Sequence, residues 1–512
     1  MKQEGQRTES LLFAMVLLLH LLPVLLLTPF VTLDGPAHLY NTRMLHTFWF
    51  GEPGVIASFF EFNNFPEPNW TGHVLLALFQ CLAAPLLAEK LMIILILLLT
   101  AWSYRMLIFQ IRPEAGWLSW LIFPFLYNFP LLLGFFNFAL AMALLPAWIA
   151  WWMKHHREVK SLRTTTGIAL FFLLLYFSHL VVFLLAGMTA GLVSLLNREK
   201  NSELSLQKEL GFLLLVSLPG LVMSFLFVFV FGTDGYRGEI TRLPLKQLFD
   251  DLLNARMFIV YDYNTEKRLS LAFTVILLLL TVLGMRQGMK NKFRNFLIMN
   301  MVISLALVFL LPDSLASGGI LSVRLVQWFF LSWCLALCCL ALPQKVMIAA
   351  GLLSALFSLS LMKVHWRVQK ELNLSARQYL SSTEKISDNT VLLPLNYSGN
   401  WMHSNLVCYL GAVKNIVVLD NYEATQHHFP LVWKAGMDPE IHMGNHVSSN
   451  KPCVNIRRSE TMTGIKVDYV SVWQKPSPAT DSCTQDVLDQ LQRLQYRKLL
   501  LKEGPLELFS GK

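Results

Sequence analysis

The sequence predicts a polytopic α-helical membrane protein of about eleven spans, followed by a C-terminal soluble α/β or α+β domain. Of its 512 residues, 54% are hydrophobic and only 15% are charged. A soluble chain carries about 25% charged residues. The mean hydropathy is +0.49. Many apolar runs are long enough to cross a bilayer, which takes about 20 residues. These observations place residues 1–362 in the membrane and residues 363–512 outside it.

The first span is predicted at residues 11–31. We expect an uncleaved first helix and not a secretory signal, because no small-residue cleavage site precedes Asp34 and many spans follow. The apolar block 165–196 is too long for one crossing, so we divide it near His179. The remaining spans are expected at 89–109, 115–127, 130–152, 165–178, 180–196, 210–231, 269–285, 294–311, 320–341 and 345–362.

The distribution of Lys and Arg predicts the orientation. Residues 71–87 are apolar but contain His73, Gln80 and Pro85, which favours an interfacial or re-entrant helix over a span. With this segment left out, the basic clusters of the short loops all fall on one side. That side is cytoplasmic and contains the N-terminus, so Asp34 and the C-terminal domain lie on the outer face. The net charge of +9 then requires no nucleic-acid partner.

Two outer segments stand out. The first outer loop, 32–88, is rich in proline and aromatic residues, which suits short amphipathic helices at the membrane surface. The long outer loop, 232–268, carries both signs of charge and one amphipathic helix near 245–253.

Residues 363–512 contain short apolar runs bounded by turn residues, which indicate strands. We expect strands at 391–395, 406–410, 416–419 and 467–473, and a helix at 486–501. In an oxidising outer compartment one pair among Cys408, Cys453 and Cys483 could be bridged. Spacing cannot choose the pair; Cys453–Cys483 is our choice.

Asp34 is the first acid after the first span, where the chain leaves the hydrocarbon. A carboxylate is costly to desolvate there and is a functional candidate. The alternative is a helix-capping or turn aspartate before Gly35-Pro36.

The run Leu33-Asp34-Gly35-Pro36-Ala37-His38-Leu39-Tyr40 resembles the first-loop aspartate motif of the GT-C superfamily of membrane glycosyltransferases. This superfamily includes protein O-mannosyltransferases and the bacterial enzyme that adds aminoarabinose to lipid A. Gly35 stands where the family usually has a second acid. Pro66-Glu67-Pro68-Asn69-Trp70 resembles the family's proline-containing approach to its second membrane helix.

The resemblance implies a sugar transfer from a polyprenyl-phosphate donor to a lipid, glycan or protein acceptor, on the outer face of a bacterial inner or plasma membrane. Asp34 would be the general base that takes the acceptor's proton. Partial desolvation would raise its pKa toward a useful value.

The donor phosphate needs a positive charge near the interface. Arg324 follows a Gly-Gly turn at the start of a span, and its planar fork suits phosphate. A pair with Asp313 or a lipid headgroup is the alternative. Arg237, in the long outer loop, is the second candidate.

His38 lies four residues after Asp34, and so could share its helical face. His38, Tyr40 and Glu67 are the other predicted substrate contacts. For Glu67 the alternative is a loop acid that contacts only solvent. Asp34 and His38 could bind a divalent metal, but no third ligand is evident in the sequence. We therefore expect a transfer without metal or other cofactor.

His179 is expected to be a packing histidine inside the membrane. In the C-terminal domain, His403, His427, His428, Asp420 and Trp401 could contact carbohydrate or could belong to the domain core.

Two other classes of protein remain open: a transporter or flippase for a lipid-linked saccharide, and a non-catalytic assembly protein. Transporters usually carry repeats and charged residues at mid-membrane. Here the polar residues gather at one face, which favours chemistry at the membrane surface.

Overall fold

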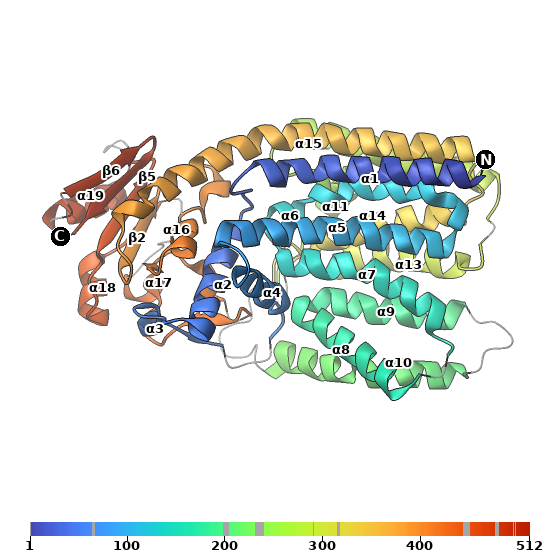
Figure 1. Ribbon diagram of the computed structural model, residues 1–512, viewed down its shortest axis with the longest axis horizontal. Coiled ribbons are helices and arrows are strands. Elements are labelled where there is room, and N and C mark those ends of the chain that lie inside the picture. Colours follow the sequence, from blue (N-terminus) through green and yellow to red (C-terminus); the bar gives the residue numbers. More distant parts are fainter. Residues whose placement is uncertain are drawn as a thin grey trace.

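The computed structural model describes most of the chain, and the fold is built from a long helical bundle with a sheet-containing domain at one end (Figure 1). The described residues are 2–63, 67–158, 160–197, 204–230, 240–289, 291–314, 318–426, 428–443, 451–476, 481–494, 496 and 498–511.

Within the described residues, eight helical segments are long and apolar enough to cross a membrane. They contain α1 (Lys2–Leu26), α5 (Pro85–Ile111), η1 (Pro113–Tyr127) with α6 (Phe129–Leu132), α7 (Phe136–His155), α10 (Leu206–Phe225) with η2 (Leu226–Val230), α12 (Tyr263–Arg286), α14 (Leu321–Ala336) with η5 (Leu337–Cys339), and α15 (Gln344–Ser381) with η6 (Ser382–Lys385).

Three further apolar helices of 17 residues each complete the bundle: α8 (Leu162–Ser178), α9 (Leu180–Leu196) and α13 (Arg294–Leu310). Together the segments account for the eleven predicted spans, including the division of the apolar block at His179. The predicted fold class is therefore confirmed: the chain is a multi-pass helical membrane protein with a sheet-containing C-terminal domain.

The first outer loop forms α2 (Gly35–Phe50), α3 (Ile56–Phe59), β1 (Phe60–Phe62) and α4 (Thr71–Gln80). With 10 residues, α4 is too short to span, as the charge pattern predicted. The loop lies between the bundle and the C-terminal domain (Figure 1). It is helical as expected, but α2 is largely buried rather than lying on a membrane surface. In the long outer loop, α11 (Leu245–Leu253) confirms the predicted amphipathic helix, and η4 (Arg256–Phe258) follows it.

The C-terminal domain has a five-stranded mixed sheet in the order β3-β2-β5-β7-β6. Its strands are β2 (Val391–Asn396), β3 (Val417–Val418), β5 (Tyr469–Trp473), β6 (Lys498–Glu503) and β7 (Leu506–Ser510). β2 pairs in parallel with β3 and β5, and β7 is antiparallel to both β5 and β6. The remaining elements are η7 (Trp401–His403), α16 (Cys408–Val413), η8 (Tyr422–Thr425), β4 (Leu431–Trp433), α17 (Pro439–His442), α18 (Ile456–Thr463) and α19 (Ser482–Arg493).

Two predictions in this domain are wrong. Residues 406–410 lead into α16 and do not form a strand, because a buried apolar run this short has no period that separates helix from strand. The predicted helix 486–501 ends at Arg493, and its last residues belong to β6. The choice of Cys453–Cys483 is confirmed: these two residues form a disulfide with a Cα–Cα distance of 5.7 Å.

The C-terminal domain is joined closely to the first outer loop. β1 pairs antiparallel with β4, from Phe60–Trp433 to Phe62–Leu431. The Tyr40 hydroxyl donates to the carbonyl of Ile416 at 2.9 Å and accepts from the Val418 amide at 3.1 Å. Helix α15 runs without a break across residue 363, from the bundle into the domain (Figure 1). The loop that carries Asp34 is thus held from both sides.

Candidate active site in a juxtamembrane cavity

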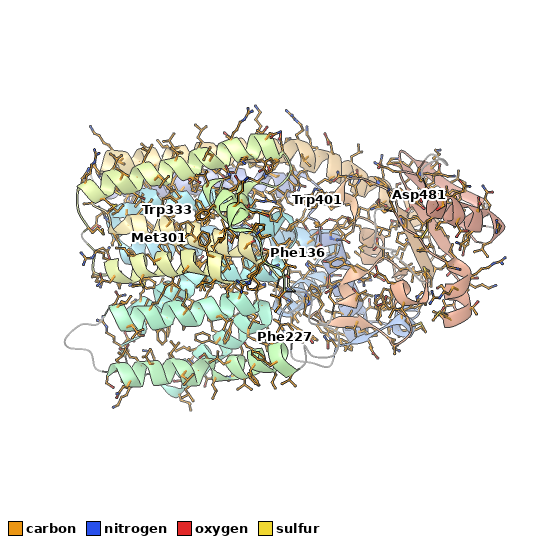
Figure 2. All side chains as sticks on the ribbon, turned by 180° about the vertical axis from the view of Figure 1, so that it is seen from behind. Phe136, Phe227, Met301, Trp333, Trp401 and Asp481 are labelled. Carbon is orange, nitrogen blue, oxygen red and sulfur yellow. A yellow bond between two sulfur atoms is a disulfide. The ribbon has the colours of Figure 1, made fainter. Side chains whose placement is uncertain are left out.

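A cavity of about 410 Å³ lies where the bundle meets the first outer loop and the C-terminal domain. Its polar wall contains Asp34, Asn69, His179, Arg324, Tyr422 and His428. Its apolar wall includes Phe135 and Phe138 of the α7 region, Leu180 of α9, Phe227 of η2 and Leu321 of α14. In Figure 2, Phe136 and Phe227 mark the end of the bundle that faces the C-terminal domain, whereas Trp333 and Met301 lie deeper in the bundle. One cavity therefore offers both a polar and a lipid-like surface.

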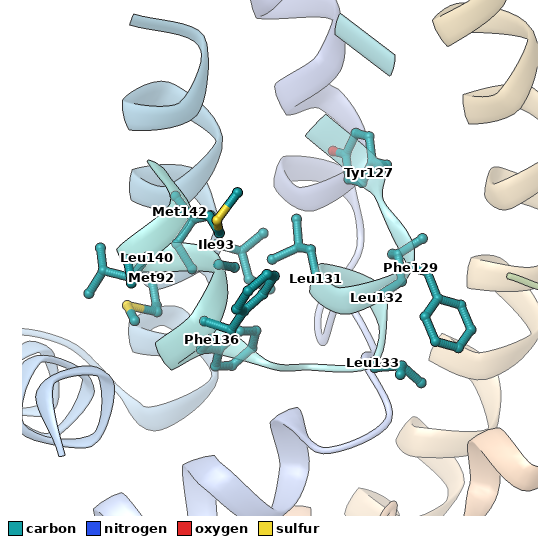
Figure 3. Packing of buried hydrophobic residues seen from close by; sticks show 14 of the residues in the cluster. Met92, Ile93, Tyr127, Phe129, Leu131, Leu132, Leu133, Phe136, Leu140 and Met142 are labelled. Carbon is teal, nitrogen blue, oxygen red and sulfur yellow. The ribbon is translucent and has the colours of Figure 1, made fainter. Parts of the chain in front are cut away.

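The backbone of Asp34 is held by the turn between η1 and α7. The Leu33 amide donates to the carbonyl of Leu132 at 3.2 Å, and the Asp34 amide donates to that of Leu133 at 3.0 Å. Figure 3 shows Leu131, Leu132 and Leu133 leading into Phe136 within a packed apolar cluster. The backbone of Asp34 is therefore hydrogen-bonded to a turn whose side chains are buried.

A glycine at position 134 lets the turn before α7 lie directly against the backbone of Asp34 and Gly35. It has a φ of +85°, and an added Cβ would lie 2.7 Å from the Gly35 nitrogen and 2.9 Å from the Asp34 nitrogen. We expect Gly134→Ala to cost about 2 to 4 kcal/mol of unfolding free energy through backbone strain and overpacking. Thermal unfolding of purified protein measures this.

The matched control is Gly187→Ala in α9, where an added Cβ meets nothing within 4 Å. An alanine there gives an unchanged or slightly higher melting temperature. Equal melting temperatures for the two variants would show that the turn at Gly134 is not constrained as described.

The packing around Gly35 explains why a glycine and not a second acid follows Asp34. A Cβ at this position would lie 2.3 Å from Thr32 Oγ1 and 2.5 Å from Glu89 Oε1. The acid that the GT-C pattern usually places after the aspartate has no room here. A buried carboxylate still lies beside the position, contributed by Glu89 at the start of α5, and it accepts from the Tyr409 hydroxyl at 3.1 Å.

The side chain of Asp34 does not cap its helix. Asp34 occupies the N-cap position of α2, but its side chain makes no capping hydrogen bond. It instead accepts from Asn405 Nδ2 at 3.2 Å and from the Tyr422 hydroxyl. The capping alternative therefore does not explain this carboxylate, which is half-buried and faces the cavity.

Burial raises the pKa of Asp34 to about 6, although His38, the Tyr422 hydrogen bond and Arg324 act in the opposite direction. At neutral pH the carboxylate is largely ionised, and it binds a proton more readily than an exposed aspartate does. This is the property that a general base needs.

Arg324 enters the cavity from the first turn of α14. Its Nη1 lies 2.9 Å from His179 Nε2, and its guanidinium stacks 4.4 Å from the ring centre of Phe135. Asp313, the partner considered from sequence, accepts from the Ser322 amide at 3.1 Å instead. Among the described residues no carboxylate forms a salt bridge with Arg324, and its Nε has no hydrogen-bond partner. Arg324 is half-buried like Asp34, and a cation with a free donor in such a place suits an anionic ligand.

Sequence reasoning underrated His179. The break between α8 and α9 places it in the cavity rather than in helix packing, and its Nε2 contacts Arg324. A histidine at the one interruption of a long apolar block was the available signal. His428 also lines the cavity, whereas His427 lies outside the described residues.

The other predicted contacts are placed as follows. His38 lines the cavity, and its Nδ1 lies 2.7 Å from Glu423 Oε2. Tyr40 does not line the cavity, since its hydroxyl is used by Ile416 and Val418. Arg237 lies outside the described residues.

Glu67 is buried beside the cavity-lining segment Pro68-Asn69 and does not itself line the cavity. Burial raises its pKa to about 8. Neither Tyr40 nor Glu67 therefore lines the cavity that contains Asp34.

Fold and site together define a multi-pass membrane protein with a juxtamembrane cavity that contains a carboxylate, Asp34, and an arginine, Arg324, which forms no salt bridge among the residues that the structure describes. No protein family and no curated protein matches the sequence. Among solved structures, the chain is similar to ArnT from Cupriavidus metallidurans in the apo state, with 10% sequence identity and a TM-score of 0.45. The alignment covers 99% of this chain and 98% of that one.

Proposed function

We propose that the protein is a membrane glycosyltransferase that moves a sugar from a polyprenyl-phosphate donor to an extracytoplasmic acceptor, with Asp34 as general base. The observation that carries the proposal is the presence of Asp34 and Arg324 in one cavity, each influencing the charge of the other. A phosphate and a reacting hydroxyl need these two groups within reach of one substrate.

The apolar wall supports a lipid-linked donor. Leu180, Phe227 and Leu321 belong to apolar helices, so a prenyl chain can leave the cavity between them while its phosphate stays at Arg324. The sugar then lies toward Asp34 and Tyr422. The acceptor hydroxyl gives its proton to Asp34 as its oxygen attacks the anomeric carbon, and the polyprenyl phosphate leaves with the bonding electron pair.

The distribution of Lys and Arg supports an orientation in which the cavity and the C-terminal domain lie on the outer face of a bacterial inner or plasma membrane. Basic residues of the short loops then lie inside.

Transfer should depend on pH through Asp34. Only the ionised carboxylate accepts a proton, so kcat/KM for the donor should fall as pH decreases through about 6. Purified protein in nanodiscs, incubated with a panel of radiolabelled polyprenyl-phosphate sugars and an acceptor extract, measures this between pH 5 and pH 8.

The melting temperature is recorded over the same range as the control, since unfolding at low pH would also reduce the rate. A pH-independent rate between pH 5 and pH 8 would remove Asp34 as the base. Absence of transfer from every donor would contradict the proposed function itself.

A further inference from the structure

A second cluster of polar side chains shares His38 with the wall of the cavity. It joins His38 of α2, His73 of α4 and Glu423 of η8, and all three are buried. One ligand atom from each lies within 4.8 Å of the others. Three separate elements thus bring two imidazoles and a carboxylate to one point.

We propose that His38, His73 and Glu423 form a site for one borderline divalent cation of the Zn²⁺ class, which fastens the C-terminal domain to the first outer loop. The site does not depend on the proposed reaction, because metal content and stability are measured without any substrate.

The carboxylate directs one oxygen to each histidine. Glu423 Oε2 lies 2.7 Å from His38 Nδ1, and Glu423 Oε1 lies 2.5 Å from His73 Nε2. Ligand atoms about 2.1 Å from a tetrahedral Zn²⁺ lie roughly 3.4 Å apart. Side-chain shifts of about 1 Å therefore suffice to admit the ion.

The outer ring nitrogens are held in the manner of metal-binding histidines. His73 Nδ1 lies 3.1 Å from the carbonyl of Asn69, a contact in which the nitrogen donates. The His38 ring also interacts with the Gly134 backbone, while its Nδ1 faces Glu423. Backbone carbonyls that accept from the far nitrogen leave the near nitrogen with its lone pair toward the ion.

The competing arrangement holds protons in place of a metal. Asn137 Nδ2 lies 3.2 Å from His73 Nδ1, so His73 could accept there and donate from Nε2 to Glu423. This arrangement binds no metal, and the experiment below separates the two.

The ligand set selects the ion. Two imidazoles and one carboxylate suit Zn²⁺ and related transition metals, whereas Mg²⁺ prefers oxygen ligands. Three protein ligands leave a fourth position, and His38 is the ligand that also lines the cavity. Water or another small group would fill that position when the ion is bound.

The site also accounts for the placement of Asp34. His38 follows Asp34 by one helical turn, and Glu423 directly follows Tyr422, which donates to Asp34. An ion that joins His38 to Glu423 would fix both neighbours of the base.

The test uses the full-length protein with its affinity tag removed. After dialysis against a chelator, the protein is titrated with Zn²⁺ or Mg²⁺, and bound metal and melting temperature are measured. We expect one equivalent of Zn²⁺, a higher melting temperature on loading, and no such response to Mg²⁺.

His73→Gln and Glu423→Gln should lose the bound Zn²⁺. The control is His442→Gln, which alters a buried histidine that contacts Ser459 within the C-terminal domain and should keep one equivalent. A wild-type protein that binds no Zn²⁺ would overturn the proposal, as would variants that retain it. Because the wild-type titration needs no variant, the proposal stays testable even if a mutant folds poorly.

Discussion

Asp34→Asn is expected to reduce kcat for sugar transfer by about 10²- to 10⁴-fold while leaving the folded protein intact. Asparagine has the same size and can still accept from Tyr422 and pair with Asn405. It cannot take a proton from the acceptor. The side chain caps no helix, so the substitution removes no structural hydrogen bond of α2.

The measurement is the initial rate in nanodiscs with a labelled donor, beside the melting temperature of each protein. Asp262→Asn is the matched control, because Asp262 caps α12 and asparagine caps equally well. A rate for Asp34→Asn near that of the wild type would exclude Asp34 from the reaction.

Arg324→Gln is expected to raise the apparent KM for the donor about 10- to 100-fold, the equivalent of one or two charge-assisted hydrogen bonds. Gln removes the positive charge and the fork that would hold phosphate. Arg324→Lys keeps the charge without the fork, so its KM should lie between those of the wild type and Arg324→Gln.

Arg242→Gln serves as the control for a general loss of positive charge on this face. Arg242 is exposed and donates to the Leu310 carbonyl, outside the cavity. If Arg324→Gln leaves donor affinity unaltered, or if Arg242→Gln weakens it equally, Arg324 does not bind the phosphate.

The helical bundle was predictable because its causes are local. Apolar runs long enough to span, basic loops and the break at His179 stand in the sequence itself. The same holds for α11, whose apolar residues follow a helical period. The strand predicted at residues 406–410 was wrong because a short buried apolar run is compatible with a helix and with a strand.

The site was predictable only in part. Asp34 and Arg324 could be recognised because each is a charge at the edge of an apolar segment, where burial is costly. Tyr422 and Glu423 could not, since they reach the first outer loop across almost 400 residues of sequence. The pairing of β1 with β4 and the packing of α2 against α16 and η8 bring them there. Glu423, a ligand of the proposed metal site, is one of these distant residues.

The central claim is that one cavity binds the donor phosphate at Arg324 and presents the sugar to Asp34. An experimental structure in nanodiscs, bound to a polyprenyl-phosphate sugar, tests it most directly. We predict phosphate oxygens within hydrogen-bond distance of Arg324, the sugar between Asp34 and Tyr422, and the prenyl chain leaving past Leu180 and Phe227. A lipid phosphate bound elsewhere, or Asp34 on the cytoplasmic side of the bilayer, would contradict the claim.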